Sequence, residues 1–281
     1  MDELIKDIIQ ADIIGKILSN QGGWINTFIN SFSSNIQKAL KFLMSKKIAQ
    51  KEGECALIKA FYEQAIEEVK NNTTQRDIFE LNNLLCIAGI TAKEIPTPNK
   101  TGINFDWMCQ FSDKARFVSN QDMRLIWGKI LAGEINNPGK YSINTLSILS
   151  RMSKEDAEEF SSLSSVLFND NFIVISETAN KSLIDFENIK RSINLGLITP
   201  IEVTETYTIE DRSHISIGNK YITLMLKNKT SACSFNVNGY TLSSSGTELA
   251  QLVTNHPKIE ELTFFKEYIE HKNNNIIVDI N

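Results

Sequence analysis

Residues that form disulfides or bind metals are scarce in this chain of 281 residues, which has four cysteines and three histidines. The cysteines stand singly in the sequence, at Cys55, Cys86, Cys109 and Cys233. No cysteine pair and no nearby histidine gives the ligand spacing of a zinc site. The pattern therefore predicts reduced, mostly buried thiols in a cytosolic protein, without a metal or another cofactor.

Long hydrophobic runs are also missing. No segment has about eighteen consecutive apolar residues, so the sequence predicts no transmembrane helix. The first residues, MDELIKDIIQADIIGKIL, lack the basic start and the cleavage site of a secretory signal. We therefore expect a cytoplasmic protein, and 42% hydrophobic residues are enough for a substantial core.

Familiar catalytic motifs are absent as well. The sequence has no Gly-x-Gly-x-x-Gly turn for a dinucleotide and no Gly-x-Ser-x-Gly elbow for a nucleophile. The string GEINNPGKYS, which begins at Gly133, has one residue too many between its glycines for a phosphate-binding loop. The serines at 243–245 are expected to cap a helix, because no base lies near them in the sequence.

What the chain does contain is a dense series of helix signals over residues 106–160. Ser119 precedes apolar residues at helical spacing and forms an approximate capping box with Asp122. Gly133 stands where a left-handed residue would end that helix. We therefore expect a helix over roughly 120–132.

The residues after this helix predict a tight corner. Pro138-Gly139 prevents the helix from resuming, and Ser142 is expected to cap the next one. Ser153 opens a third helix, with acidic residues in its first turn where the helix dipole favours them. Short helices joined by tight turns must pack on each other, so we expect a compact helical region here.

Residues 106–160 resemble the signature of the bacterial domain-of-unknown-function family numbered 2806. That signature is an Asp-Trp pair, a Ser-capped helix, a Trp…LAGE turn, a Pro-Gly-x-(Tyr/Phe)-Ser turn and a final helix. The matching residues include Asp106, Trp107, Trp127, Gly133, Glu134, Pro138, Gly139 and Ser142. Asn144 departs from the pattern, because relatives often have arginine there, so we expect no anion contact at this position. The resemblance implies no activity, while a looser likeness to the Abi-alpha abortive-infection family suggests defence against phage.

The hydrophobic pattern changes along the chain and predicts an α+β protein. Residues 1–91 have helical spacing and form an N-terminal helical region, and residues 102–168 form the helical signature domain, in which both signature tryptophans are expected in the core. Residues 169–281 contain mostly strand patterns. We therefore expect a helical N-terminal two-thirds and a smaller, mixed α/β, winged-helix-like C-terminal domain.

The winged-helix likeness depends on the order of features in the last third. A short helix ends at Gly196, strands follow, and the string Tyr-x-Leu-Ser-x-x-Gly-x-x-Leu begins at Tyr240. Asn238-Gly239 is expected to fold one strand into a hairpin. Further helices are predicted from Ser245 and over 257–271. Strands are expected at 201–207, 214–217, 220–227, 233–242 and 276–280.

Nucleic-acid binding is opposed by the charges of this region. Residues 151–281 contain 12 basic and 18 acidic residues, whereas residues 1–150 contain 17 and 16. Lys190 and Arg191 are the basic residues on the candidate recognition helix. Binding to DNA needs clustered cations, so a winged-helix DNA-binding regulator is the alternative rather than the leading hypothesis.

A second candidate surface lies near the N-terminus, where lysines follow an aromatic segment. The segment QKALKFLMSKKIAQK has no acidic residue among its lysines, which include Lys38, Lys41, Lys46 and Lys47. Trp24, Phe28 and Phe32 lie upstream on one helical face. A solvated lysine face is the simpler interpretation, and peripheral membrane contact is the alternative.

The sequence as a whole favours contacts over catalysis. Asp106, Glu134 and Asp156 lie near helix ends, where carboxylates usually complement dipoles, so an enzyme with an unrecognised carboxylate site is the second alternative. The leading hypothesis is a non-enzymatic interaction or effector-type module. We expect it to act as a homo-oligomer, with an interface in residues 1–37, or through a protein partner.

Overall fold

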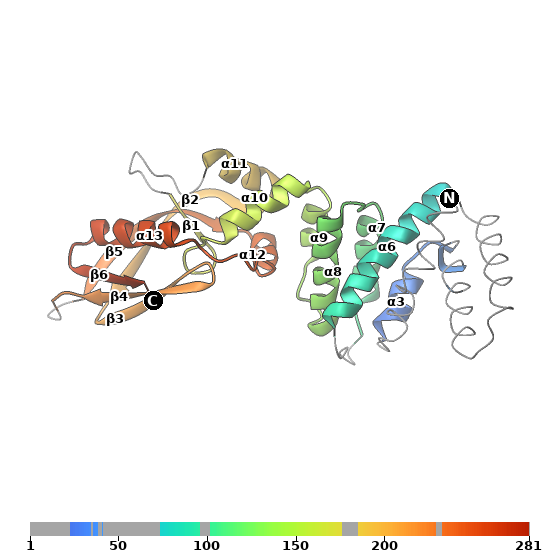
Figure 1. Ribbon diagram of the computed structural model, residues 1–281, viewed down its shortest axis with the longest axis horizontal. Coiled ribbons are helices and arrows are strands. Elements are labelled where there is room, and N and C mark those ends of the chain that lie inside the picture. The colour runs from blue at the N-terminus through green and yellow to red at the C-terminus, as the bar shows by residue number, and fades with distance from the viewer. Residues whose placement is uncertain are drawn as a thin grey trace. The chain divides into compact units, whose positions relative to one another are not determined.

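The computed structural model describes residues 23–34, 36–38, 41, 74–95, 102–175, 185–228 and 232–280. The chain divides into two compact units, residues 1–150 and 151–281. Figure 1 shows helices in the first unit and antiparallel strands with helices in the second. The predicted α+β class is confirmed. Much of the N-terminal helical region predicted over residues 1–91, including residues 1–22 and 42–73, lies outside the described residues.

The described helices of the first unit include two long ones that pack on each other. They are α3 (Trp24–Asn30), α6 (Gln75–Glu94), α7 (Phe105–Ala115), α8 (Gln121–Asn136) and α9 (Ile143–Leu149). Thr74 begins α6 with a capping box to Asp77. The Thr91 hydroxyl near the other end of α6 lies 3.1 Å from the carbonyl oxygen of Gly128, which ties α6 to α8.

The core of the first unit is built on the two signature tryptophans. Trp127 is fully buried, and its ring meets Phe111 edge-on at 5.2 Å between centroids. Trp107 stacks on Phe111 at 5.3 Å and donates its indole N–H to the carbonyl of Tyr141 at 2.7 Å. The prediction that both tryptophans lie in the core is therefore confirmed.

Helix α8 differs from its prediction at both ends. Asn120, not Ser119, caps it, and the Asn120 side chain accepts the backbone N–H groups of Asp122 and Met123. The helix continues to Asn136, so Gly133 lies inside it and does not have a positive φ. The positive φ is found at Gly139, where the turn actually reverses.

Gly133 is required for a different reason than the one predicted. A Cβ atom there would lie 2.7 Å from the Tyr141 ring, because the chain folds back over α8. We expect Gly133→Val to lower the free energy of unfolding of the first unit by about 1–3 kcal/mol through overpacking. Urea unfolding followed by tryptophan fluorescence measures this change. The control is Gly102→Val, where a Cβ meets nothing within 4 Å, and an equal effect in both variants would contradict the explanation.

The second unit alternates helices and strands and has the predicted caps. Its elements are α10 (Lys154–Ser164), β1 (Phe172–Val174), α11 (Phe186–Leu195), β2 (Ile198–Ile209), β3 (Arg212–Ile217), β4 (Lys220–Leu226), β5 (Cys233–Leu242), α12 (Ser244–Ala250), α13 (Ile259–Lys272) and β6 (Ile276–Ile280). Helix α10 falls within the predicted signature domain, but it belongs to this unit. Ser153 and Ser243 cap α10 and α12, and Gly196 ends α11 in the left-handed conformation.

The strands form two three-stranded antiparallel groups, in the orders β1-β5-β2 and β3-β4-β6. The predicted hairpin at Asn238-Gly239 is wrong. Both residues lie within β5, where Gly239 pairs with Val174 of β1 and Val203 of β2. A Cβ on Gly239 would lie 1.9 Å from the carbonyl oxygen of Ile173, so the close approach of β1 requires glycine there.

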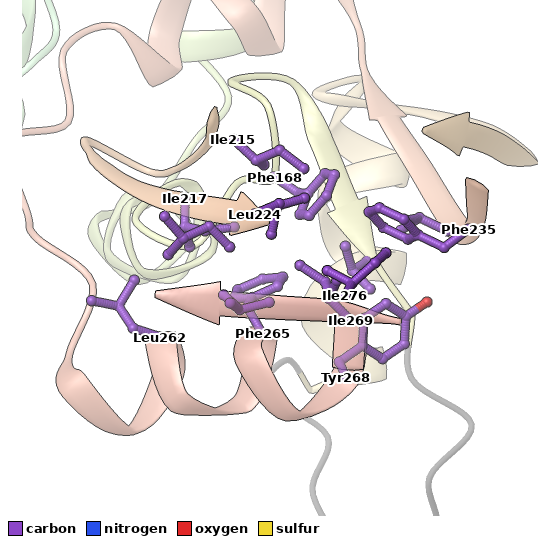
Figure 2. Close-up of a cluster of buried hydrophobic side chains, with 14 of the residues drawn as sticks. Phe168, Ile215, Ile217, Leu224, Phe235, Leu262, Phe265, Tyr268, Ile269 and Ile276 are labelled. Atoms are coloured by element: carbon purple, nitrogen blue, oxygen red, sulfur yellow. The ribbon is translucent and has the colours of Figure 1, made fainter. Parts of the chain in front are cut away.

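The core of the second unit lies between α13 and the strands. Figure 2 shows Leu262, Phe265 and Ile269 of α13 facing residues of β3, β4 and β6, and Phe168 lies in the same cluster. Alternate residues of β4, such as Ile222 and Leu224, supply the buried side of the strand. This packing positions β2 and β5, which carry the candidate surface described below.

Candidate interaction surface

The N-terminal aromatic residues that the sequence suggested for interaction are buried. Trp24, Phe28 and Phe32 are 3%, 1% and 7% exposed. The Ser31 hydroxyl after α3 lies 2.6 Å from that of Ser112 on α7, which joins this segment to the signature helices. An interface over residues 1–37 remains a prediction, and residues 1–22 lie outside the described residues.

The lysine segment is only partly described. Lys38 and Lys41 are exposed, and Lys46 and Lys47 lie outside the described residues. Among the helices that the structure describes, none combines the length and apolar character needed to cross a bilayer.

The candidate nucleic-acid residues on α11 are both paired with acids. The Lys190 amine lies 2.8 Å from a Glu187 carboxylate oxygen, and the Arg191 guanidinium lies 3.0 Å from Glu159 and 3.7 Å from Asp156. Phosphate contact would require these pairs to open or to share their cations. Sequence reasoning identified the two cations but missed the acids on α10, because those acids are distant in the sequence.

Two of the three candidate carboxylates, Glu134 and Asp156, accept hydrogen bonds that hold local structure, and the third, Asp106, lies at the surface. Asp106 is exposed in the first turn of α7, and Asp156 accepts the Ser153 N–H in a capping box. Glu134 is 1% exposed and accepts the N–H groups of Gly139 at 2.6 Å and Tyr141 at 3.0 Å. Within the described residues, no group of three or more His, Cys, Asp or Glu side chains is arranged to hold a metal ion.

The cysteine prediction needs a correction. Cys86, Cys109 and Cys233 are free thiols, as expected, but each is only partly buried. Burial and, to a smaller extent, the nearby Asp106 raise the pKa of the Cys109 thiol. Cys55 lies outside the described residues.

A hollow of about 300 Å³ lies in the second unit. Three of its polar side chains bond within the fold, whereas the buried hydroxyl of Ser164, which also lines the hollow, has no hydrogen-bond partner among the described residues. Asp170 accepts the Ser216 hydroxyl at 2.7 Å, and Asn255 donates to Ser161 at 3.0 Å. Asn219 lies 2.8 Å from the His256 ring. These contacts indicate a structural role for the lining groups.

The outer edge of strand β2 is a candidate site for pairing with a strand of a partner. It pairs with β5 along one edge, and among the described residues no strand pairs with its other edge. Pro200 lies before the regular stretch of pairing, which runs from Glu202 to Ile209. Native proteins usually cover or interrupt an edge of this length, because its free N–H and C=O groups are a template for another strand.

The strand register shows which main-chain groups of β2 are free. Asn238 and Leu242 of β5 bond to β1, so their main-chain groups face β1. Antiparallel strands alternate, and therefore Val237 and Gly239 face β2 and bond to Glu205 and Val203. The residues between them, Thr204, Thr206 and Thr208, consequently direct their N–H and C=O groups away from β5. All three threonines are exposed.

The exposed face beside this edge is a ladder of uncharged polar pairs. Thr204 donates to Asn238 at 3.0 Å, and Thr206 donates to Asn236 at 2.9 Å. The hydroxyls of Thr208 and Ser234 lie 2.9 Å apart. These cross-strand bonds hold the threonine side chains in place, so the edge is preorganised for pairing.

Tyr207 anchors the inner face of β2 to the core of the second unit. Its ring packs on Phe168 and Phe235, and its hydroxyl donates a short hydrogen bond to Glu205 on the same strand. Burial, followed by the hydrogen bond to Glu205, raises the pKa of the Tyr207 hydroxyl well above its usual range.

A second exposed surface lies where α6, α7 and α8 meet in the first unit. Phe117 is 46% exposed, and the guanidinium groups of Arg76 and Arg116 lie over its ring, at 5.1 and 4.8 Å from the ring centre. Glu80 holds both arginines, and Arg124 fixes the corner through Asn83. Arginine and aromatic side chains of this kind are enriched at protein interfaces.

The described residues form a two-unit α+β protein, and in this part of the chain the outer edge of β2 has no strand paired with it. The sequence profile of one family matches residues 63–266. The chain therefore belongs to that family, which is described as protein of unknown function, DUF2806. No curated protein and no solved structure matches the chain. The resemblance stated from residues 106–160 is thus confirmed for this family, and a likeness to Abi-alpha is not shown.

Proposed function

We propose that this chain is a non-enzymatic interaction or effector-type module of a bacterial cytosolic protein, and that it acts through contacts with protein. The unpaired edge of β2 carries the proposal. Free backbone donors and acceptors along an extended, exposed strand are best satisfied by another strand. The exposed Phe117 ring of the first unit, with the arginines beside it, is a second surface against which a partner can pack.

Association of the purified chain tests the proposal. Light scattering over about 1–100 µM, a range in which interfaces of standard size hold, is expected to give a mass above the 31.7 kDa of one chain. A monomer throughout this range would overturn self-assembly as the mode of action.

A winged-helix DNA-binding regulator is the alternative function. The order α10, β1, α11, β2, β5 and α12 favours it, although β3 and β4 lie between the two long strands. The ion pairs of Lys190 and Arg191 oppose it. Retention of duplex DNA that falls steeply with salt would favour the alternative, whereas the interaction module is expected to show none.

We extend the proposal to defence against phage on the loose Abi-alpha likeness of the signature. Plaque formation on a bacterial host that expresses the chain measures this effect. We expect fewer or smaller plaques with the wild-type chain than with the Thr206→Pro variant described next. Equal plaque numbers for the wild-type chain and an empty vector would remove the defence role and leave the interaction module intact.

A further inference from the structure

We infer that β2 pairs with β2 of a second copy of this chain, antiparallel across a two-fold axis at Thr206. This inference rests on the proposed function and deepens it, because it names the partner, the strand and the register. It also differs from the interface over residues 1–37 that the sequence suggested.

The main chain restricts which registers can form. Only residues that face outward can exchange hydrogen bonds with a new strand, so Thr204, Thr206 and Thr208 must lie opposite outward-facing residues of the second copy. With the axis at Thr206, that residue lies opposite itself and Thr204 lies opposite Thr208. Every free main-chain group of these threonines then gains a partner.

The side chains match in this register. On the inner face, Glu205 lies opposite Tyr207 of the second copy, and Val203 lies opposite Ile209. On the outer face, threonine meets threonine, a pairing that antiparallel sheets favour. Within one copy, Thr206 bonds to Asn236 of β5. The row of polar side chains on the outer face therefore continues from one copy into the other. Between residues 203 and 209, no two like charges lie opposite each other in this register.

Neighbouring registers are worse. An axis at Glu205 places two carboxylates directly opposite each other, and like charges in that position destabilise a sheet. An axis at Thr204 places Val203 opposite Glu205, and an axis at Tyr207 places Glu205 opposite Ile209. In the favoured register, the like pair is Glu202 with Glu210, at the exposed ends where water screens the charges.

A proline at the axis tests the main-chain part of the inference. The N–H of Thr206 faces outward and is not needed for pairing with β5. The Thr206→Pro variant should therefore fold, because edge strands tolerate proline. We expect it to weaken self-association by about tenfold or more, because the ring blocks the incoming strand and removes a donor. Thr206→Val is the matched control, since it loses the hydroxyl but keeps the N–H, and it should still dimerise. Circular dichroism checks the fold of both variants.

A cysteine at the axis tests the register. Opposed residues of a hydrogen-bonded pair have Cα atoms about 5.5 Å apart, which suits a disulfide. Thr206→Cys should therefore form a covalent dimer under mild oxidation. Thr204→Cys is the control, because the two copies of that residue would lie roughly 14 Å apart. The native cysteines give the same background in both variants.

The outcomes separate the inference from the proposed function. A wild-type monomer would overturn this inference and self-assembly, and it would leave contact with a different protein as the mode of action of the proposed function. A wild-type dimer that survives Thr206→Pro and is not trapped by Thr206→Cys would overturn the β2 inference alone. Trapping that is equally fast at Thr204→Cys would overturn the register. Dissociation by proline together with selective trapping at Thr206 supports the inference.

Discussion

Gly239→Ala is expected to disrupt the second unit strongly. The added Cβ would lie 1.9 Å from the carbonyl oxygen of Ile173, and that oxygen belongs to the backbone of β1. The strand cannot move away without losing its pairing with β5. We expect a loss of about 3 kcal/mol or more in the free energy of unfolding of this unit, at the upper end of overpacking effects.

Hydrogen exchange followed by mass spectrometry measures this loss for each unit separately. Peptides from residues 198–242 should lose protection in Gly239→Ala, while peptides from residues 105–149 should keep it. Gly102→Ala serves as the control, because a Cβ there meets nothing within 4 Å. Unchanged protection in β5 would show that β1 does not cross Gly239 at this distance.

Glu134→Ala is expected to have the second largest effect, in the first unit. The buried carboxylate accepts the N–H groups of Gly139 and Tyr141, and alanine leaves both donors without an acceptor. Hydrogen bonds to charged groups and the cost of unpaired buried donors together predict a loss of about 3 kcal/mol. Glu134→Gln, which keeps one oxygen as an acceptor, should lie between alanine and the wild type.

Urea unfolding followed by tryptophan fluorescence reports on this unit, because Trp107 donates to the carbonyl of Tyr141 in the same corner. Glu94→Ala is the matched control, since Glu94 is exposed at the end of α6. If Glu134→Ala and Glu94→Ala unfold at the same urea concentration, the carboxylate does not hold the corner.

Local signals in the sequence were sufficient where one or two residues decide the structure. Ser142 and Ser153 begin helices because a hydroxyl reaches the N–H group three residues later, and that bond depends on neighbouring residues alone. Gly196 ends α11 for a similarly local reason. Such positions could be assigned before any contact was known.

The same reasoning failed where a distant segment decides. Asn238-Gly239 has the composition of a tight turn, but β1 and β2 bind both sides of it and keep it extended. Gly133 resembles a helix end, yet the space above it is filled by Tyr141 after the chain turns back. The free edge of β2 was not predictable, because it depends on which strands pair and which do not.

The position of β4 between β3 and β6 has a consequence for synthesis of the chain. The β3–β4 pair is local and forms early, whereas β4 gains its second neighbour only when Ile276–Ile280 has left the ribosome. Until then, the nascent second unit exposes a buried strand as well as the edge of β2. The described helices of the first unit, by contrast, have all been synthesised once residue 149 has been added. Chaperone binding during translation should therefore concentrate on the second unit.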